Sequence, residues 1–369
     1  MIIAIHSFAG GFTSGVQRVF PVNYQLETHG FGIETAESLG VPVINRPFTE
    51  WPLYPARFVF GNPRCNAFSC TSSLGQHGQW MPSTRDIHEL CDYGIRAKAD
   101  IIIWESVQQA YTHGEELRKH LIDLLQGYRI VHIFMNTATW GNAQIRRRYF
   151  FVAYKQGRNF NIVPPELKQA GTVKDAIWNM RHITVREFDG EWTVDTYRRI
   201  SKLEHQVMPY LHVMNDINDE CYMHEERIKE HCPDIYQKWI TRRSHIPFSI
   251  HCIIKLGWDR ESPSLCNSCS RLIHPEFHRL VTPRECAAIM GWKHLPIGND
   301  MFAQIAKGIV PDVGEWLAQQ VQLYFEDHWG NEDFESMFDM SQKTWVGRYF
   351  TNEPREKIFD MTRYVCFKQ

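Results

Sequence analysis

The chain has 369 residues, 43% of them hydrophobic, which is enough for one large domain or two unequal ones with a sizeable core. A formal net charge of −2 gives the chain as a whole no sign of a nucleic-acid partner, so a local basic patch would have to supply one. No apolar run approaches membrane-spanning length, and the 10 cysteines, without dense regular spacing, favour reduced thiols in a cytoplasmic setting.

The first part of the chain predicts a strand, a glycine-rich turn and a helix. Residues 2–5 are apolar, residues 7–15 are small and rich in glycine, and helix-like sequence starts at Val16. This order of elements brings backbone N–H groups close to a cofactor. A tight turn with a purely structural role has the same signature.

A second predicted strand covers residues 24–27 and ends in an acid, Glu27. A carboxylate at the end of the second strand commonly binds the hydroxyls of a ribose. Glu34 competes for this role, and a solvated glutamate is the plain alternative for either residue.

A cysteine follows the next predicted strand. Residues 58–60 are apolar, and Gly61 and Pro63 then interrupt the strand pattern, so Cys65 lies in a loop. Loops at the carboxyl ends of strands are where open α/β sheets place their ligands. Because nearby positive charge favours a thiolate, Cys65 beside Arg64 is a candidate nucleophile, and a buried unreactive cysteine is the alternative.

Glu105 ends another buried strand. Residues 86–97 have helical spacing, and residues 101–104 form an apolar run that leads into Glu105. A carboxyl group in that position is desolvated, so its pKa tends to rise, which suits a group that must hold a proton. An acid at the start of a helix is the alternative. A helix over residues 114–125 and a strand over 128–135 follow.

Two arginines then alternate on a predicted strand. Gln144, Arg146 and Arg148 are followed by an apolar run, and alternate strand residues share a face. Arg146 and Arg148 therefore point together, while Arg147 points away. Arginines aimed into an apolar sheet need acids or a substrate as partners, and a solvated basic edge is the alternative.

The middle of the chain, residues 159–262, shows no comparable motif apart from partly helical sequence over 218–243. Its spacings fit no compact metal site for the histidines at positions 205, 212, 224 and 231. Cys266 and Cys269 have the spacing of half a zinc site, but no second pair follows, so we predict that they are structural and that no metal binds.

The last recognisable stretches precede residue 322. Thr282 is a good helix N-cap, with Pro283 at the first helical position. Residues 304–313 lead into a helix predicted from Gly314. Residues 322–369 carry no pattern to which we assign a role.

In this order, the stretches resemble the motifs of the cytosine-C5 DNA methyltransferases. Six of them match in the order of the family: residues 8–10, 63–69, 105–107, 144–148, 279–285 and 304–313. Gln144, Arg146 and Arg148 reproduce the family's Gln-x-Arg-x-Arg. Around Cys65 the chain reads Pro-Arg-Cys-Asn, where the family has Pro-Pro-Cys-Gln.

The resemblance implies an α/β fold: a Rossmann-like methyltransferase sheet domain with a small inserted target-recognition domain. It places the catalytic domain at residues 1–158 and 263–321, and the target-recognition region at 159–262. Residues 322–369 would form a C-terminal extension. The implied partner is DNA, with no membrane, and we expect a monomer.

The resemblance also implies roles for individual residues and a donor, S-adenosylmethionine. The implied catalytic residues are Cys65, Glu105, Arg146 and Arg148. The implied donor-binding residues are Phe8, Ala9, Gly10, Gly11, Glu27, Pro63, Lys307 and Gly308. The implied contacts to the substrate come from Arg64, Ser69 and Gln144.

Lys307 departs from the family, which commonly has asparagine there. A lysine beside a sulfonium cation is unfavourable in a site of low dielectric, and an additional anion would resolve the conflict. One alternative is therefore a carboxylated donor, carboxy-S-adenosylmethionine; another is that Lys307 turns toward solvent or a phosphate. A DNA-binding homologue without catalysis is the third alternative.

Overall fold

The computed structural model describes residues 1–65, 68, 84–112, 114–156, 160, 168–181, 229–237, 254–265, 272–326 and 347–350. The chain divides into two compact units. The first comprises Met1–Trp140, Arg146–Leu167 and Gly308–Gln369, and the second comprises Gly141–Ile145 and Lys168–Lys307.

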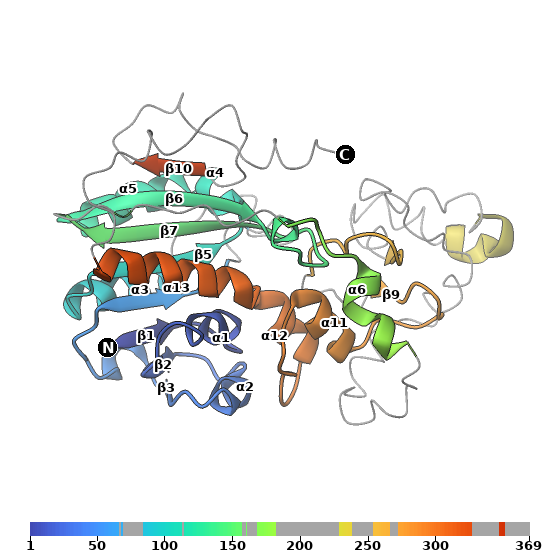
Figure 1. Ribbon diagram of the computed structural model, residues 1–369, viewed down its shortest axis with the longest axis horizontal. Helices are drawn as coiled ribbons and strands as arrows, with labels where there is room; N and C mark the ends of the chain where they lie inside the picture. Colours follow the sequence, from blue (N-terminus) through green and yellow to red (C-terminus); the bar gives the residue numbers. More distant parts are fainter. Residues whose placement is uncertain are drawn as a thin grey trace. The chain divides into compact units, whose positions relative to one another are not determined.

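The first unit is built on an eight-stranded sheet with the strand order β10-β6-β7-β5-β4-β1-β2-β3 (Figure 1). Strands β3, β2, β1, β4 and β5 are parallel, and β7 is antiparallel to its neighbours β5 and β6. The bounds are β1 Ile2–Ile5, β2 Tyr24–Glu27, β3 Val43–Asn45, β4 Phe58–Gly61, β5 Ile101–Ser106, β6 Tyr128–Asn136, β7 Arg147–Lys155 and β10 Gly347–Phe350.

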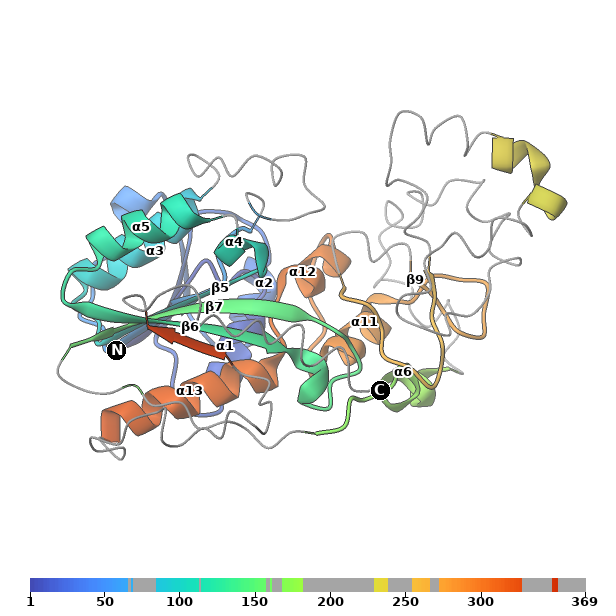
Figure 2. The same cartoon turned by 90° about the horizontal axis from the view of Figure 1, so that it is seen from above.

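Helices cover both faces of this sheet (Figure 2). On one face, α3 (Arg85–Arg96) and α5 (Glu115–Leu124) bury apolar side chains against Val59 and Ile102. On the other face lie α1 (Gly11–Val16) and α13 (Pro311–Glu326), where Phe12 contacts Phe60. Val59 and Phe60 thus face opposite sides, as the two-residue repeat of a strand requires. Short elements complete the unit: α2 (Ile33–Ser38), α4 (Gln109–Thr112), η1 (Phe48–Glu50) and η2 (Thr137–Thr139).

Helix α13, late in the chain, packs against α1, which lies near the N-terminus. A Cβ added to Gly15 would lie 2.2 Å from the carbonyl oxygen of Pro311, so only glycine allows the two helices to approach this closely. Arg18 pairs with Asp312 and Glu315 at 2.6 and 2.7 Å. The sheet unit is therefore assembled from segments that are distant in sequence.

The glycine-rich stretch corrects one prediction. We expected a turn over residues 7–15 and a helix from Val16, but α1 covers Gly11–Val16 and ends at that residue. Gly15 occurs within the helix because the backbone of α13 lies against it at that position. The helix predicted from Gly314 likewise begins earlier, at Pro311, a residue that the first turn of a helix tolerates.

Among its described residues, the second unit contains the helices α6 (Val173–Ile177), α11 (Pro283–Met290) and α12 (Met301–Lys307), besides helical residues between 229 and 237. It also contains η3 (Trp178–Met180) and a two-stranded parallel sheet of β8 (Ile254–Lys255) and β9 (Leu272–Ile273). Thr282 caps α11 with a reciprocal capping box, which confirms the predicted helix start.

This division groups residues 263–307 with the second unit, whereas the predicted catalytic domain includes them. The predicted boundaries at 158, 262 and 321 stay predictions. Of the predicted partly helical sequence at 218–243, residues 229–237 are described, and all of them except residue 232 are helical. None of the described helices is both long and apolar enough to cross a membrane.

Candidate active site

Two strands bring Glu105 and Arg148 together. Glu105 lies near the carboxyl end of β5, and β7 runs antiparallel beside it, so β7 starts at the same edge of the sheet. The Nε atom of Arg148 lies 2.7 Å from Oε1 of Glu105, and both side chains are largely buried. The insertion of one antiparallel strand thus supplies the acid with its cation.

Arg146 lies next to this pair and is buried. Its Nη2 donates a hydrogen bond of 2.7 Å to the carbonyl oxygen of Gly308, and its backbone N–H donates to Oδ1 of Asn136 at 3.2 Å. Arg147 is exposed, which confirms that the arginines alternate between faces. Arg146 consequently fixes the backbone that follows α12.

Cys65 lies four residues beyond β4, in the predicted loop, and its side chain is only partly exposed. Burial and the negative charge of Glu105 raise the pKa of the thiol, while Arg148 and Arg146 act to lower it. These electrostatic interactions place all four predicted catalytic residues in one cluster. The pKa of Cys65 stays above its ordinary value, so the resting side chain is a protonated thiol.

Glu105 is held in an environment that favours its neutral form. Burial raises the pKa of its carboxyl group, and the opposing effect of Arg148 and Arg146 is smaller, so the net shift is upward. The sequence predicted this direction from the position of Glu105 at the end of an apolar strand. A buried carboxyl group whose pKa is raised holds a proton more readily than a solvated one, which a general acid requires.

Arg64 does not serve Cys65 as its position in the sequence suggests. Its Nε and Nη2 atoms each donate a hydrogen bond of 2.7 Å to the carboxylate of Asp86, at the start of α3. The charges that lower the pKa of Cys65 come instead from Arg146 and Arg148. The bidentate pair accounts for the arginine at a position where the family has proline.

The predicted donor loop after β1 has an unusual backbone. His6 and Phe8 have φ angles of 51° and 49°, and Gly10 has a φ of 75°. Side chains rarely adopt the left-handed region, so surrounding contacts must hold the two non-glycine residues there. The Phe8 N–H donates to Oε1 of Glu27 at 2.9 Å, and Gln25 donates to the Phe8 carbonyl at 2.8 Å.

Glu27 therefore holds the loop from inside. It is fully buried, with one carboxylate oxygen accepting from Phe8 and Gln25, and the other lies 3.7 Å from His6. The competing acid, Glu34, is exposed on α2. In this arrangement Glu27 shapes the loop, and its predicted contact with a ribose stays a prediction.

A cavity of about 460 Å³ opens beyond the carboxyl ends of β2, β3 and β4. It is lined by Thr28, His29, Asn45, Arg46, Pro47, Phe48, Arg64, Arg85, Asp86 and Glu89. Both the volume and the position suit a nucleoside-sized ligand in an open α/β sheet. Phe48 offers an aromatic face, and Asn45 and Thr28 offer hydrogen-bonding groups, so the residues present fit the adenosine part of a donor.

The remaining predicted donor residues follow β1, follow β4 or lie where α12 ends. Phe8, Ala9, Gly10, Gly11 and Pro63 are buried. Lys307 is the last residue of α12 and is half-buried, and the next residue, Gly308, accepts the hydrogen bond from Arg146. The backbone beside Lys307 is thus tied to the catalytic cluster.

Gln144 has a structural environment in the second unit. It is fully buried, its carbonyl oxygen accepts the Leu265 N–H at 2.9 Å, and its amide lies 3.3 Å from the sulfur of Met290. Its predicted contact with the substrate stays a prediction. Ser69, Cys266 and Cys269 lie outside the described residues, as do the histidines at positions 205, 212 and 224.

The sequence did not single out His6, Asp86 or Glu89. His6 directly follows an apolar strand, and Asp86 and Glu89 are three residues apart on α3, so they share a helix face. Both features can be recognised in the sequence. The sequence does not reveal that this face of α3 meets the end of β1 in the fold.

Comparison with known families decides the relationship. The family model for C-5 cytosine-specific DNA methylases matches residues 54–323. The chain belongs to this family. A curated relative, the type II methyltransferase M1.HphI of Haemophilus parahaemolyticus, is 22% identical over 244 residues. That alignment spans 63% of this chain and 58% of the relative's length.

Solved structures share the fold. A prophage-encoded protein of E. coli, assigned as a DNA modification methyltransferase, superposes with a TM-score of 0.61 at 18% identity, covering 88% of this chain and 99% of that one. A Spodoptera frugiperda DNMT2 mutant reaches 0.55 at 12% identity, covering 87% and 99%. The Entamoeba histolytica methyltransferase EhMeth reaches 0.52 at 12%, covering 89% and 99%. These likenesses confirm the predicted Rossmann-like methyltransferase fold.

Proposed function

We propose that this chain transfers a methyl group from S-adenosylmethionine to C5 of cytosine in DNA, through a covalent adduct between Cys65 and C6 of the base. Membership of the C-5 cytosine-specific DNA methylase family supports the reaction class. The observation that carries the proposal is the cluster of Cys65, Glu105, Arg146 and Arg148 at one edge of the sheet.

Cytosine C5 is a poor nucleophile, so the base must first be activated. The thiolate of Cys65 adds to C6 while Glu105 holds a proton at N3, which gives C5 the character of an enamine. The bound donor supplies the electrophilic methyl group that C5 takes up. Loss of the C5 proton and expulsion of the thiolate then restore the aromatic ring. The direction of the pKa shift of Glu105 supports its part, because burial raises the pKa of the carboxyl group and so favours its protonated form.

Arg146 and Arg148 act on both Cys65 and Glu105. The positive charges of Arg146 and Arg148 favour the thiolate form of Cys65, against the effects of burial and of Glu105. The ion pair with Glu105 also fixes the acid in one position. The target base must leave the duplex to reach Cys65, because chemistry on a base takes place outside the stack.

The test is mass spectrometry of nucleosides from DNA that has been treated with the protein and the donor. We expect 5-methylcytosine with the wild-type chain and none with Cys65→Ser, because a hydroxyl is too weak a nucleophile for the addition to C6. Circular dichroism checks that the serine variant is folded. Modification by Cys65→Ser at the wild-type rate would overturn the covalent mechanism, and an inactive wild-type chain that binds DNA would favour the homologue without catalysis.

A second candidate is the same chemistry with carboxy-S-adenosylmethionine, which would give 5-carboxymethylcytosine. The observation that favours it is the position of Lys307, which precedes the residue that Arg146 binds. An ammonium group there would disfavour a neutral methyl beside a sulfonium and favour a carboxylate.

Lys307→Asn separates the two donors. If Lys307 faces the transferred group, the substitution shifts the ratio of rates toward S-adenosylmethionine. Both donors are measured with both proteins at one fixed salt concentration, because contacts with DNA phosphates depend on salt. An unchanged ratio discards the carboxylated donor as far as Lys307 is concerned.

A further inference from the structure

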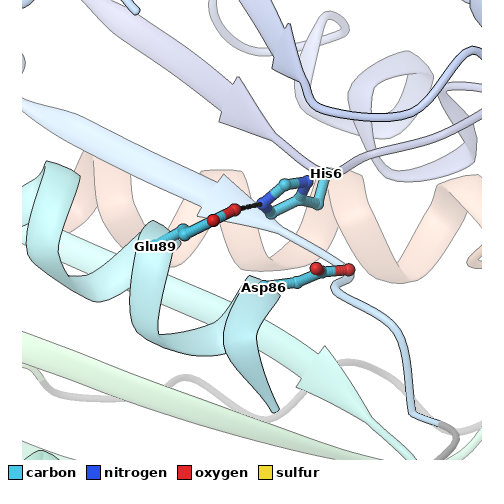
Figure 3. A group of neighbouring side chains, drawn as sticks. All are labelled: His6, Asp86 and Glu89. Carbon is cyan, nitrogen blue, oxygen red and sulfur yellow. Dashed lines mark hydrogen bonds and ion pairs between the residues drawn. The ribbon is translucent and has the colours of Figure 1, made fainter. Parts of the chain in front are cut away.

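A fully buried histidine lies between two carboxylates from different elements. Nε2 of His6, after β1, is 3.1 Å from Oε2 of Glu89 on α3 (Figure 3). Nδ1 of the same ring is 3.7 Å from Oε2 of Glu27, at the end of β2. His6 and Glu27 are completely excluded from solvent, and Glu89 nearly so. The imidazole ring therefore bridges two strands and a helix.

The charges around His6 balance when the ring carries a proton. Three carboxylates face it: Glu27 from β2, and Asp86 and Glu89 from α3. Two guanidinium groups neutralise two of them, since Arg64 binds Asp86 and Arg85 lies 2.7 Å from the second oxygen of Glu89. The third carboxylate, that of Glu27, still needs a positive charge, and a protonated His6 provides it.

The remaining titratable group in the cluster is His29, whose Nε2 lies 3.7 Å from Asp86. Burial by itself lowers the pKa of His6, but the carboxylates of Glu27 and Glu89 outweigh burial and raise the pKa to about 9. The ring is therefore charged at neutral pH.

The trio of His6, Asp86 and Glu89 also has the residue types of a divalent-cation site. The charges argue against that use. Arg64 occupies both carboxylate oxygens of Asp86, and a dication with a neutral imidazole would leave the cluster with a net positive charge. A proton on His6 meets the same need without displacing any hydrogen bond.

The bridge connects the donor loop to the cavity. Oε1 of Glu27 accepts the N–H of Phe8, which holds that residue in its strained backbone conformation. Glu89, on the other side of the ring, lines the cavity. A neutral His6 would leave the carboxylate of Glu27 buried without its cation, and the loss would destabilise the group that orders the loop.

We propose that His6 is a positioning residue of the donor site: its imidazolium holds Glu27 against Phe8 and ties the donor loop to α3 through Glu89. This inference rests on the proposed function, because the ligand in question is S-adenosylmethionine. The role is indirect, since His6 itself is buried and does not line the cavity.

Isothermal titration of the full chain with S-adenosylmethionine tests the proposal, from about pH 7 to about pH 10, on either side of the pKa of His6 at about 9. We expect wild-type affinity to fall as pH rises through this pKa. His6→Gln binds the donor roughly tenfold more weakly at neutral pH and shows no further fall. In turnover, the KM for the donor rises while kcat changes little. His120→Gln, an exposed histidine on α5, is the matched control and keeps the wild-type pH profile.

A second variant covers the case in which His6→Gln does not fold. Glu89→Gln removes one carboxylate that raises the pKa of His6, so the fall in donor affinity moves to lower pH. A purely structural role of Glu89 would not move this midpoint. An unchanged midpoint, or wild-type affinity in His6→Gln, overturns the proposal.

Two further outcomes are distinguishable. If elemental analysis of the purified protein finds one divalent ion per chain and a chelator abolishes donor binding, the cluster is a cation site and the charge role of His6 is wrong. If the wild-type chain neither binds the donor nor methylates DNA, the proposed function itself fails. Donor binding by the wild type with a flat pH profile and unaffected variants overturns only the role of His6.

Discussion

At the scale of single residues, the catalytic cluster depends on opposing effects on one carboxyl group. Burial raises the pKa of Glu105 and the two arginines lower it, with burial the larger effect. The same arginines act on Cys65 in the direction that favours a thiolate. The same two arginines therefore counteract the effect of burial on both groups, the carboxyl of Glu105 and the thiol of Cys65.

Glu105→Gln tests the acid directly. An amide cannot supply a proton to N3, so we expect the single-turnover rate to fall by about 10²–10⁴-fold while DNA binding survives. Rapid-quench kinetics measure the rate, and fluorescence anisotropy measures the binding. Glu116→Gln, an exposed glutamate on α5, is the matched control. Equal rates for Glu105→Gln and wild type would show that Glu105 has another role.

At the scale of elements, the contact of α1 with α13 holds the two ends of the sheet unit together. The close approach at Gly15 leaves no room for a side chain, because the nearest atoms belong to the backbone of α13. Backbone atoms cannot move aside as the end of a flexible side chain can, so even one methyl group forces the helices apart.

Gly15→Ala should therefore destabilise the protein by about 1–3 kcal/mol, despite the higher helix propensity of alanine. Urea denaturation followed by circular dichroism measures the loss. Gly30→Ala is the control, because a Cβ at that position meets no atom within 4 Å. If both variants unfold at the same urea concentration as wild type, the contact of α1 with α13 is looser than described.

At the scale of the whole molecule, the two units suggest a division of labour. The predicted catalytic residues Cys65, Glu105, Arg146 and Arg148 all belong to the first unit, whereas most of residues 159–262 belong to the second. The family inserts its target-recognition region at this point of the chain, so we predict that residues 159–262 carry the sequence preference.

A chimera tests this placement. Residues 159–262 are replaced by the corresponding segment of a relative with known specificity, and the modified sites are mapped by sequencing of treated DNA. We expect the specificity to move with the segment. The Cys65→Ser version of the chimera shows that any modification comes from this active site. An active chimera that keeps the original target sites would refute the placement.

The sequence by itself determined the strands that carry the site and the types of residue at their ends. Apolar runs bounded by glycine, proline and polar residues predicted β1 and β2 with their observed bounds, and placed Glu105 at the end of β5. The N-terminus of α11 was also predictable from the sequence, because the contacts of its capping box span only three residues. These patterns arise from interactions between residues that are close in sequence, so the predictions needed no knowledge of the fold.

Only the tertiary structure decided which of these residues meet. The edge strand β10 pairs with β6 more than two hundred residues away in sequence, and Gly15 of α1 lies directly against the backbone of α13. Arg64 turns to Asp86 rather than to its neighbour Cys65, and His6 reaches Glu89 across 83 positions of the chain. Such pairings follow from which charges the fold buries together. A buried charge must find its partner in space, and sequence spacing does not encode that distance.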